Sequence, residues 1–331
     1  MLVIISTIPT RILILLCLFV SININAKWET LDTNGTPSKR HENGAVVFNN
    51  EIYIIGGRGI KPIDIYDPKT NIWRQNKKPP FELHHITPVA LPNKILIVSG
   101  FTGKYPKETP LSHIWEYYPV KDKWVKGKAI PKSRQRGAAG VTIYDNKVYI
   151  VGGAKQGHTS GTTNMFDQYD TQTNQWTTLT DAPHIRDHSN LVILDSMLVS
   201  LAGRNTSYHE PESFTAFFGQ VNHFIDVYNF DNASWHTLSS RLPIGWAGAG
   251  ALVHNNNLYI VGGENASKAA NNRMFSFNFS TKTFYELESL NQGRHGTNAI
   301  KINDTLYFAM GSGNRGGRPE LKSIEAYRLN K

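Results

Sequence analysis

The sequence has almost no cysteine. Its 331 residues include one, Cys17, which lies in a short apolar segment near the start of the chain. We interpret that segment as part of a leader that is removed, so the mature chain holds no disulfide, no thiolate nucleophile and no cysteine-ligated metal. An exported protein of this size without disulfides is typical of a bacterial envelope rather than an animal extracellular space.

The first 26 residues lack acidic side chains and contain one basic residue, Arg11. The apolar run that follows, 12–20, is too short for a membrane span, and Ala26 suits the last position before a signal-peptidase cut. We therefore predict a signal peptide over residues 1–26 and a mature chain over 27–331. The mature protein is expected in the periplasm or outside the cell, with no membrane segment after cleavage.

The sequence also lacks a strong charge bias. After the leader it has 34 Lys and Arg residues (35 less Arg11) against 26 Asp and Glu residues, spread along the chain without a basic tail. This moderate excess favours anionic ligands mildly and predicts no nucleic-acid partner. There is no linker or change of composition after Lys27, so we expect one domain.

Familiar catalytic and cofactor motifs are missing. There is no Gly-x-Ser-x-Gly elbow and no His-Glu-x-x-His pair, and the glycine-rich segment 311–317 is followed by no predicted helix. Convergence of His41, His84 and His85 on a metal would need a three-dimensional coincidence that the sequence does not indicate. We predict no metal and no cofactor.

A unit of about 50 residues recurs six times. The first copy, residues 40–73, has two apolar runs separated by an Asn-Asn-Glu turn, then a glycine pair, a third run and Trp73. Short β-branched runs bounded by Asn, Asp and Gly are typical of buried strands. An aromatic residue of the third run precedes another by seven residues in Tyr66/Trp73, Tyr117/Trp124, Tyr169/Trp176, Tyr228/Trp235 and Phe277/Phe284.

This unit resembles the kelch repeat, which implies an all-β fold, a six-bladed β-propeller. The blades are expected at approximately 40–76, 83–127, 134–179, 186–238, 246–287 and 294–331. The last copy lacks a fourth strand, while 27–31 matches the fourth-strand pattern. We therefore expect the N-terminal strand to complete blade six and close the ring.

In such a blade, the loop before the first strand and the loop between the second and third strands lie on one face. The aligned copies then predict rings of residues at the mouth of the central channel. These rings, together with Arg315 from the loop after the last glycine, supply the candidate ligand-binding residues Arg40, His41, Arg58, Arg136, Arg186, His188, Arg204, Trp246, Glu264, Arg294, His295 and Arg315. The candidate catalytic residues are His84, His85 and Tyr105.

Two interpretations of these arginines stay open. They pair with nearby acids to tie the blades together, or they bind an anion; arginines outnumber acids about two to one in the rings, and guanidinium groups bind carboxylate and sulfate well. Trp246 likewise either stacks on a sugar ring or plugs the channel. Surrounding positive charge is expected to keep a histidine base neutral.

The six copies resemble the secreted bacterial kelch proteins called galactose-oxidase-like, but copper galactose oxidase activity is excluded because its cross-linked cysteine is missing. The chain is also similar to the periplasmic sialic-acid mutarotase/epimerase family, which implies an acidic sugar as ligand. We predict an exported propeller that binds, or acts on, an acidic carbohydrate: a uronate, a sialate, a sulfated sugar or another small anion. The alternatives are a protein-interaction propeller without chemistry and a polysaccharide lyase.

Overall fold

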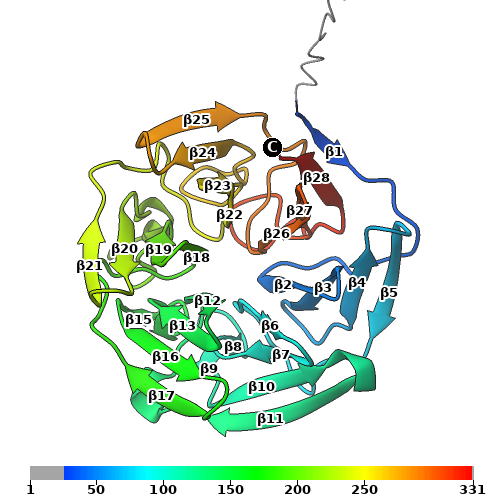
Figure 1. The fold of residues 1–331 in the computed structure, drawn as a ribbon, viewed down its shortest axis with the longest axis horizontal. Helices are drawn as coiled ribbons and strands as arrows, with labels where there is room; N and C mark the ends of the chain where they lie inside the picture. Colours follow the sequence, from blue (N-terminus) through cyan, green and yellow to red (C-terminus); the bar gives the residue numbers. More distant parts are fainter. Residues whose placement is uncertain (1–25, 330–331) are drawn as a thin grey trace, which may run out of the picture.

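The structure, a computed structural model, describes residues 26–329, and six four-stranded antiparallel sheets surround a central channel (Figure 1). The predicted all-β, six-bladed propeller is confirmed. The predicted signal peptide lies outside the described residues, apart from Ala26. Among the described residues, no helix is long and apolar enough to cross a membrane.

Each blade has its first strand at the channel and its fourth strand at the rim. The first three blades, from the channel outwards, are β2 (Asn43–Phe48), β3 (Glu51–Gly56), β4 (Ile63–Asp67) and β5 (Ile72–Asn76); β6 (Val89–Leu91), β7 (Lys94–Ile97), β10 (His113–Tyr118) and β11 (Lys123–Ala129); β12 (Gly140–Tyr144), β13 (Lys147–Val151), β16 (Phe166–Asp170) and β17 (Gln175–Thr178).

The other three blades repeat this order. They are β18 (Asn190–Leu194), β19 (Met197–Leu201), β20 (Ile225–Asn229) and β21 (Ser234–Thr237); β22 (Gly250–His254), β23 (Asn257–Val261), β24 (Met274–Asn278) and β25 (Thr283–Leu287); β26 (Ala299–Ile302), β27 (Thr305–Ala309), β28 (Ile324–Arg328) and β1 (Trp28–Thr30).

Two-residue turns join the first two strands in several blades. In the first blade Asn49 and Asn50 have positive φ angles of 52° and 61°, and Asn255 and Asn256 repeat this in the fifth. Asparagine tolerates the left-handed conformation, and two such residues in succession make the turn whose twist suits a β-hairpin. The Asn and Asp residues that separate the apolar runs therefore fix the register of each blade.

Aromatic pairs hold the outer strands to the third strands. All five pairs identified in the sequence are direct cross-strand neighbours, with ring centroids 4.5–5.2 Å apart. In the sixth blade Trp28 of β1 opposes Tyr327 of β28 in the same way, with centroids 5.4 Å apart. The N-terminal strand thus occupies the fourth-strand position of the last blade, which leaves the ring closed.

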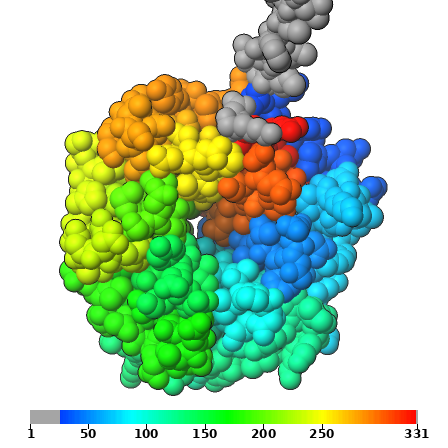
Figure 2. Space-filling view, viewed as in Figure 1, coloured from blue at the N-terminus to red at the C-terminus, as the bar shows by residue number. Residues whose placement is uncertain are grey.

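Further short elements lie beyond the blades, in the loops between second and third strands. They are two hairpins, β8 (Phe101–Thr102) with β9 (Thr109–Pro110) and β14 (Ala154–Gln156) with β15 (Ser160–Thr162), and the 3-10 turn η3 (Ala216–Gly219). The space-filling view shows the hollow at the centre of the ring (Figure 2). The loops that carry these elements build the channel mouth described below.

Replacing Trp28 by alanine tests the closing strand. Its side chain is 4% exposed, and Nε1 donates a hydrogen bond to Glu288 O at 3.1 Å. We expect Trp28→Ala to lower the free energy of unfolding by roughly 3–5 kcal/mol, the usual cost of removing a buried aromatic ring. Urea denaturation measures this change, and Glu29→Ala, exposed on the same strand, is the matched control. Equal midpoints for the two variants would contradict the closure.

Candidate functional site

A belt of backbone hydrogen bonds surrounds the channel just before the inner strands. The belt residues all have positive φ, between 52° and 71°; they are Glu42, His85, Ala138, His188, Gly248 and Gly296. From His85 onwards, each N–H donates to the carbonyl of its counterpart in the preceding blade, over 2.7–3.1 Å, and Asn43 N–H closes the circle on Gly296. Left-handed backbone is costly for residues other than glycine, so the belt holds Glu42, His85 and His188 in conformations that they would not adopt alone.

Four of the predicted ligand-binding arginines do not reach the mouth. Each is at most 3% exposed and ion-paired with a carboxylate on the third strand of its own blade; the pairs are Arg40–Asp64, Arg136–Asp167, Arg186–Asp226 and Arg294–Glu325. Each also donates to the carbonyl at the end of its second strand, for example Arg40 Nη1 to Gly56 O at 2.8 Å. The prediction that they converge on one anion is wrong, because their donors are used within the blades.

The two blades without this arginine replace the ion pair by apolar packing. In the fifth blade Trp246 occupies the arginine position and Phe275 the carboxylate position, with ring centroids 5.6 Å apart. In the second blade Leu83 and Trp115 belong to one hydrophobic cluster at the same places. Trp246 is fully buried in its blade, so it neither stacks on a ligand nor plugs the channel.

A cavity of about 310 Å³ opens at the mouth of the channel. Its lining residues come from loops of several blades and are His41, Glu42, Arg58, His85, Tyr105, His158, Arg204, Phe217, Phe218, Glu264, Gly316 and Gly317. Six of the candidates from the sequence, His41, Arg58, His85, Tyr105, Arg204 and Glu264, therefore lie together. His188 lies next to them, in the wall of the adjoining channel.

His158 and the phenylalanines of η3 are not among the residues predicted from the sequence. His158 lies in the turn of the β14–β15 hairpin, four residues beyond Ala154, outside the positions that the six repeats share. Phe217 and Phe218 lie in the long loop of the fourth blade. The unequal length of these loops was the available signal, because such loops place residues that the repeat itself does not align.

Both arginines that line the cavity are held by acids. Arg58 pairs with Glu108, and Arg204 pairs with Glu264 while its guanidinium lies 4.9 Å from the centre of the Phe217 ring. The same contact network holds two further carboxylates, those of Glu42 and Asp187, so four carboxylates face two arginines there. The expected excess of arginine over acid at the mouth is therefore wrong.

These carboxylates stay ionised in spite of burial. Burial raises the pKa of Glu42, but His188, His295, His41 and Arg58 outweigh it and lower that pKa to about 2. The pKa of Glu108 is also lowered, because hydrogen bonds and charge from His158 and Arg58 exceed the effect of its burial. The mouth therefore carries firmly ionised acids at neutral pH.

The two adjacent histidines of the second blade differ in what they can do. His84 is fully buried with Nδ1 2.6 Å from His85 Nδ1 and Nε2 2.9 Å from Gly103 O, so neither nitrogen is available to a ligand. Burial, then Arg58, lowers its pKa to about 4. The pKa of His85 is also lowered, chiefly by burial and then by His84, and its ring borders the cavity. Of the two, only His85 is placed to meet a ligand.

The remaining candidates have structural or peripheral contacts. His295 is fully buried, with Nε2 2.8 Å from Gly316 O, and His41 Nδ1 lies 2.8 Å from Glu320. Arg315 donates to Ala266 O, and its guanidinium lies 5.3 Å from the centre of the Phe218 ring. Tyr105 is half exposed, and burial together with Glu108 raises the pKa of its phenol. A phenol that ionises less readily is a poorer general base at neutral pH.

Comparisons with known proteins agree with this architecture. Residues 17–268 match the family model described as the Attractin/LZTR1 beta-propeller. The solved structure of YjhT superposes with a TM-score of 0.71 over 88% of this chain and 96% of that one, at 16% sequence identity, which speaks for the fold alone.

Several curated relatives are kelch proteins. Kelch-like protein terF of Aspergillus terreus is 27% identical over 327 residues, which cover 89% of this chain and 68% of that protein. Kelch-like protein 40 of Xenopus tropicalis is 28% identical over 54% of the chain and 29% of its own length. N-acetylneuraminate epimerase of Salmonella newport is 26% identical over 76% of the chain and 59% of its own length.

The buried ion pairs predict a distinct pattern of mutational stability. Arg186→Leu leaves the Asp226 carboxylate buried without its partner, so we expect a loss of roughly 3–5 kcal/mol in urea unfolding. Arg273→Leu breaks an ion pair with Glu286 in which both side chains are more than 40% exposed, and is expected to cost less than about 1 kcal/mol.

The double variant Arg186→Trp with Asp226→Phe copies the apolar pair of the fifth blade. We expect it to be at least about 1 kcal/mol more stable than the sum of its two single variants, because no unpaired charge is left behind. Strict additivity in this double-mutant cycle would show that the apolar pair of the fifth blade cannot replace the ion pair of the fourth.

Proposed function

The chain belongs to the kelch-repeat β-propellers, in the family described as attractin/LZTR1 β-propellers, and from that premise we propose that it binds a carbohydrate in the mouth cavity. The observation that carries the proposal is the cavity itself. At about 310 Å³ it is in the range of small-molecule sites, and its walls combine aromatic faces with fixed polar groups. The residues 1–26 suggest that the protein works after export.

A sugar offers two kinds of surface, and the cavity matches both. The partly exposed Phe218 and the half-exposed Tyr105 supply apolar faces for the C–H side of a pyranose ring, while Phe217 is buried behind them. Glu42 and Glu264 supply acceptors for hydroxyl groups, and Arg58 lies among the lining groups as a donor. The Salmonella epimerase, named for an N-acetylated sugar acid, is a relative whose name supports a sugar ligand.

The charge of the mouth bears on which sugar is bound. An acidic sugar would have to compete with Glu108 for Arg58 and with Glu264 for Arg204, whereas a neutral sugar leaves both ion pairs in place. We therefore propose that neutral sugars bind more tightly than uronates or sialates at neutral pH. The same pairing leaves a lyase without free arginines to neutralise a uronate, which weakens that alternative.

Protein interaction is the second candidate function. Kelch propellers commonly mediate protein interactions, and this chain exposes a group of large side chains beside the mouth, Tyr105, Tyr208 and Phe214. Tyr105 and Phe214 lie with ring centroids 6.2 Å apart, so two of these rings form a continuous apolar rim. Clustered exposed aromatic rings are typical of interfaces with other proteins.

The proposed function is tested by isothermal titration of the protein with galactose, N-acetylglucosamine, glucuronate and N-acetylneuraminate. We expect Tyr105→Ala and Phe218→Ala to weaken binding about tenfold each, because each removes about 1.4 kcal/mol of ring contact. Tyr285→Ala, an exposed tyrosine on outer strand β25, is the matched control and is expected to bind as the wild type does.

Arg58→Gln separates the two ligand classes. If neutral sugars are the ligands, this change alters their affinity less than threefold; a selective loss of acidic-sugar binding would instead show that the arginine receives a carboxylate. Absence of binding for all four sugars, with Tyr105→Ala impairing capture of a protein partner, would favour the interaction function.

A further inference from the structure

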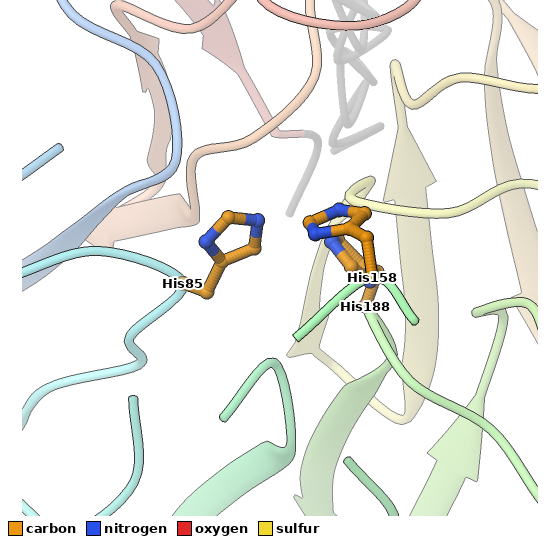
Figure 3. A group of neighbouring side chains, drawn as sticks. All are labelled: His85, His158 and His188. Carbon is orange, nitrogen blue, oxygen red and sulfur yellow. The ribbon is translucent and has the colours of Figure 1, made fainter. Parts of the chain in front are cut away.

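Three histidines from three blades meet where the mouth cavity joins the channel. His85 precedes β6, His158 lies in the β14–β15 hairpin and His188 precedes β18, and Figure 3 shows their rings grouped together. All three are buried, and one ligating atom from each lies within 4.8 Å of the others. Their ring centroids are 4.9–5.4 Å apart. The proposed sugar site does not account for this convergence.

Each of the three rings is held by its Nδ1 atom. His158 Nδ1 lies 3.0 Å from Glu108 Oε1, and His188 Nδ1 lies 2.6 Å from Asp187 Oδ1. A carboxylate accepts, so in both rings Nδ1 carries a proton, and in the neutral ring Nε2 then carries the lone pair. A carboxylate behind the second nitrogen is the arrangement that orients histidine ligands in metal sites.

His85 has the same arrangement, with the proton on Nδ1 and the lone pair on Nε2, through its contact with His84. His84 Nε2 lies 2.9 Å from Gly103 O, which can only accept, and 3.4 Å from the donor Arg58 Nη1; the shorter contact assigns the proton to Nε2. The neutral ring then presents its Nδ1 lone pair to His85 Nδ1–H at 2.6 Å. The Nε2 atom of His85 then has a lone pair. This atom is buried and has no hydrogen bond among the described residues, although Glu42 Oε2 lies 3.3 Å away without suitable geometry. A buried polar atom without a partner is costly and calls for an explanation.

We propose that His85, His158 and His188 bind a divalent transition-metal ion, with zinc as the best fit. Three neutral imidazoles with an open fourth position suit zinc, and no cysteine is needed for such a site. Side-chain rotations that shorten the separations between ligand atoms would complete it, since zinc–nitrogen bonds are about 2.0–2.1 Å. Glu42 or a water molecule from the cavity supplies the fourth ligand.

The charge around the cluster supports a cation. Four carboxylates, those of Glu42, Glu108, Asp187 and Glu264, belong to the same contact network as two arginines, Arg58 and Arg204. Zinc binds neutral imidazoles, and with the histidines in that state the four carboxylates exceed the two guanidinium groups by two negative charges. A divalent ion balances them in a buried setting where unbalanced charge is expensive.

One contact has to change when the ion binds. Arg204 Nη2 lies 3.2 Å from His188 Nε2, and because a guanidinium only donates, this contact confirms the lone pair on that nitrogen. The ion takes the place of this donor. Arg204 keeps its ion pair with Glu264 and its hydrogen bond from Nε to Thr206, so it stays anchored when it gives up the histidine.

The test is metal titration of the purified, chelator-stripped protein without any sugar, so its outcome is independent of the proposed function. Isothermal titration with Zn²⁺ is expected to show one ion bound per chain. Titration with Co²⁺ is expected to give the visible absorption of four- or five-coordinate cobalt, which needs no variant to interpret. An octahedral cobalt spectrum, or no saturable binding of either ion, would overturn the proposal.

Matched variants assign the ligands. His158→Gln, in a hairpin turn, is expected to weaken zinc binding at least 100-fold, and Glu108→Gln, which removes the carboxylate behind His158, by 10- to 100-fold. His41→Gln changes another cavity histidine outside the cluster and is the control, with unchanged affinity expected. Circular dichroism checks that each variant is folded. Zinc affinity that is the same in folded His158→Gln and His41→Gln would refute this ligand set.

Discussion

The buried ion pair between an arginine and a third-strand carboxylate orders four of the six blades and determines where their arginines point. In four blades the guanidinium group joins the start of the first strand to the end of the second strand and to the middle of the third, as Arg40 does through Gly56 O and Asp64. A charge placed there without its partner would be costly, so the two residues are fixed together. The pair therefore orders each blade and also withdraws four arginines from the channel mouth.

The architecture could be read from the sequence because each of its signals is local. Alternating apolar runs, Asn turns such as Asn49–Asn50 and aromatic residues seven apart all act between neighbouring strands, where spacing along the chain determines spacing in the structure. The position of Trp28 followed from the same rule, since it repeats the pattern of the other fourth strands and lies opposite Tyr327.

The candidate site was predicted less well, for a physical reason. Arg58, His85 and Arg204 follow the repeat, so the repeat predicts both the correct face and their place at the cavity. The direction of Arg136 into its own blade is not predictable from the repeat, since it depends on Asp167 and on carbonyl groups that the side chain meets only after folding. His158 was not predicted, because its hairpin lies outside the residues that the six repeats share.

The functional residues of this fold come from two sources, the repeated blade and the loops that differ between blades. The belt of left-handed residues is set by the repeat, and it holds His85 and His188 at two of six equivalent places. The unequal loops then add what differs between blades, such as His158 and Glu108, which pair with each other across two blades. His158 needs only its neighbouring blades, whereas the whole cavity is lined by the first blade, through His41, and by the sixth, through Gly317. Closure of the propeller is thus a condition for assembling its mouth, in addition to a means of protecting its sheet edges.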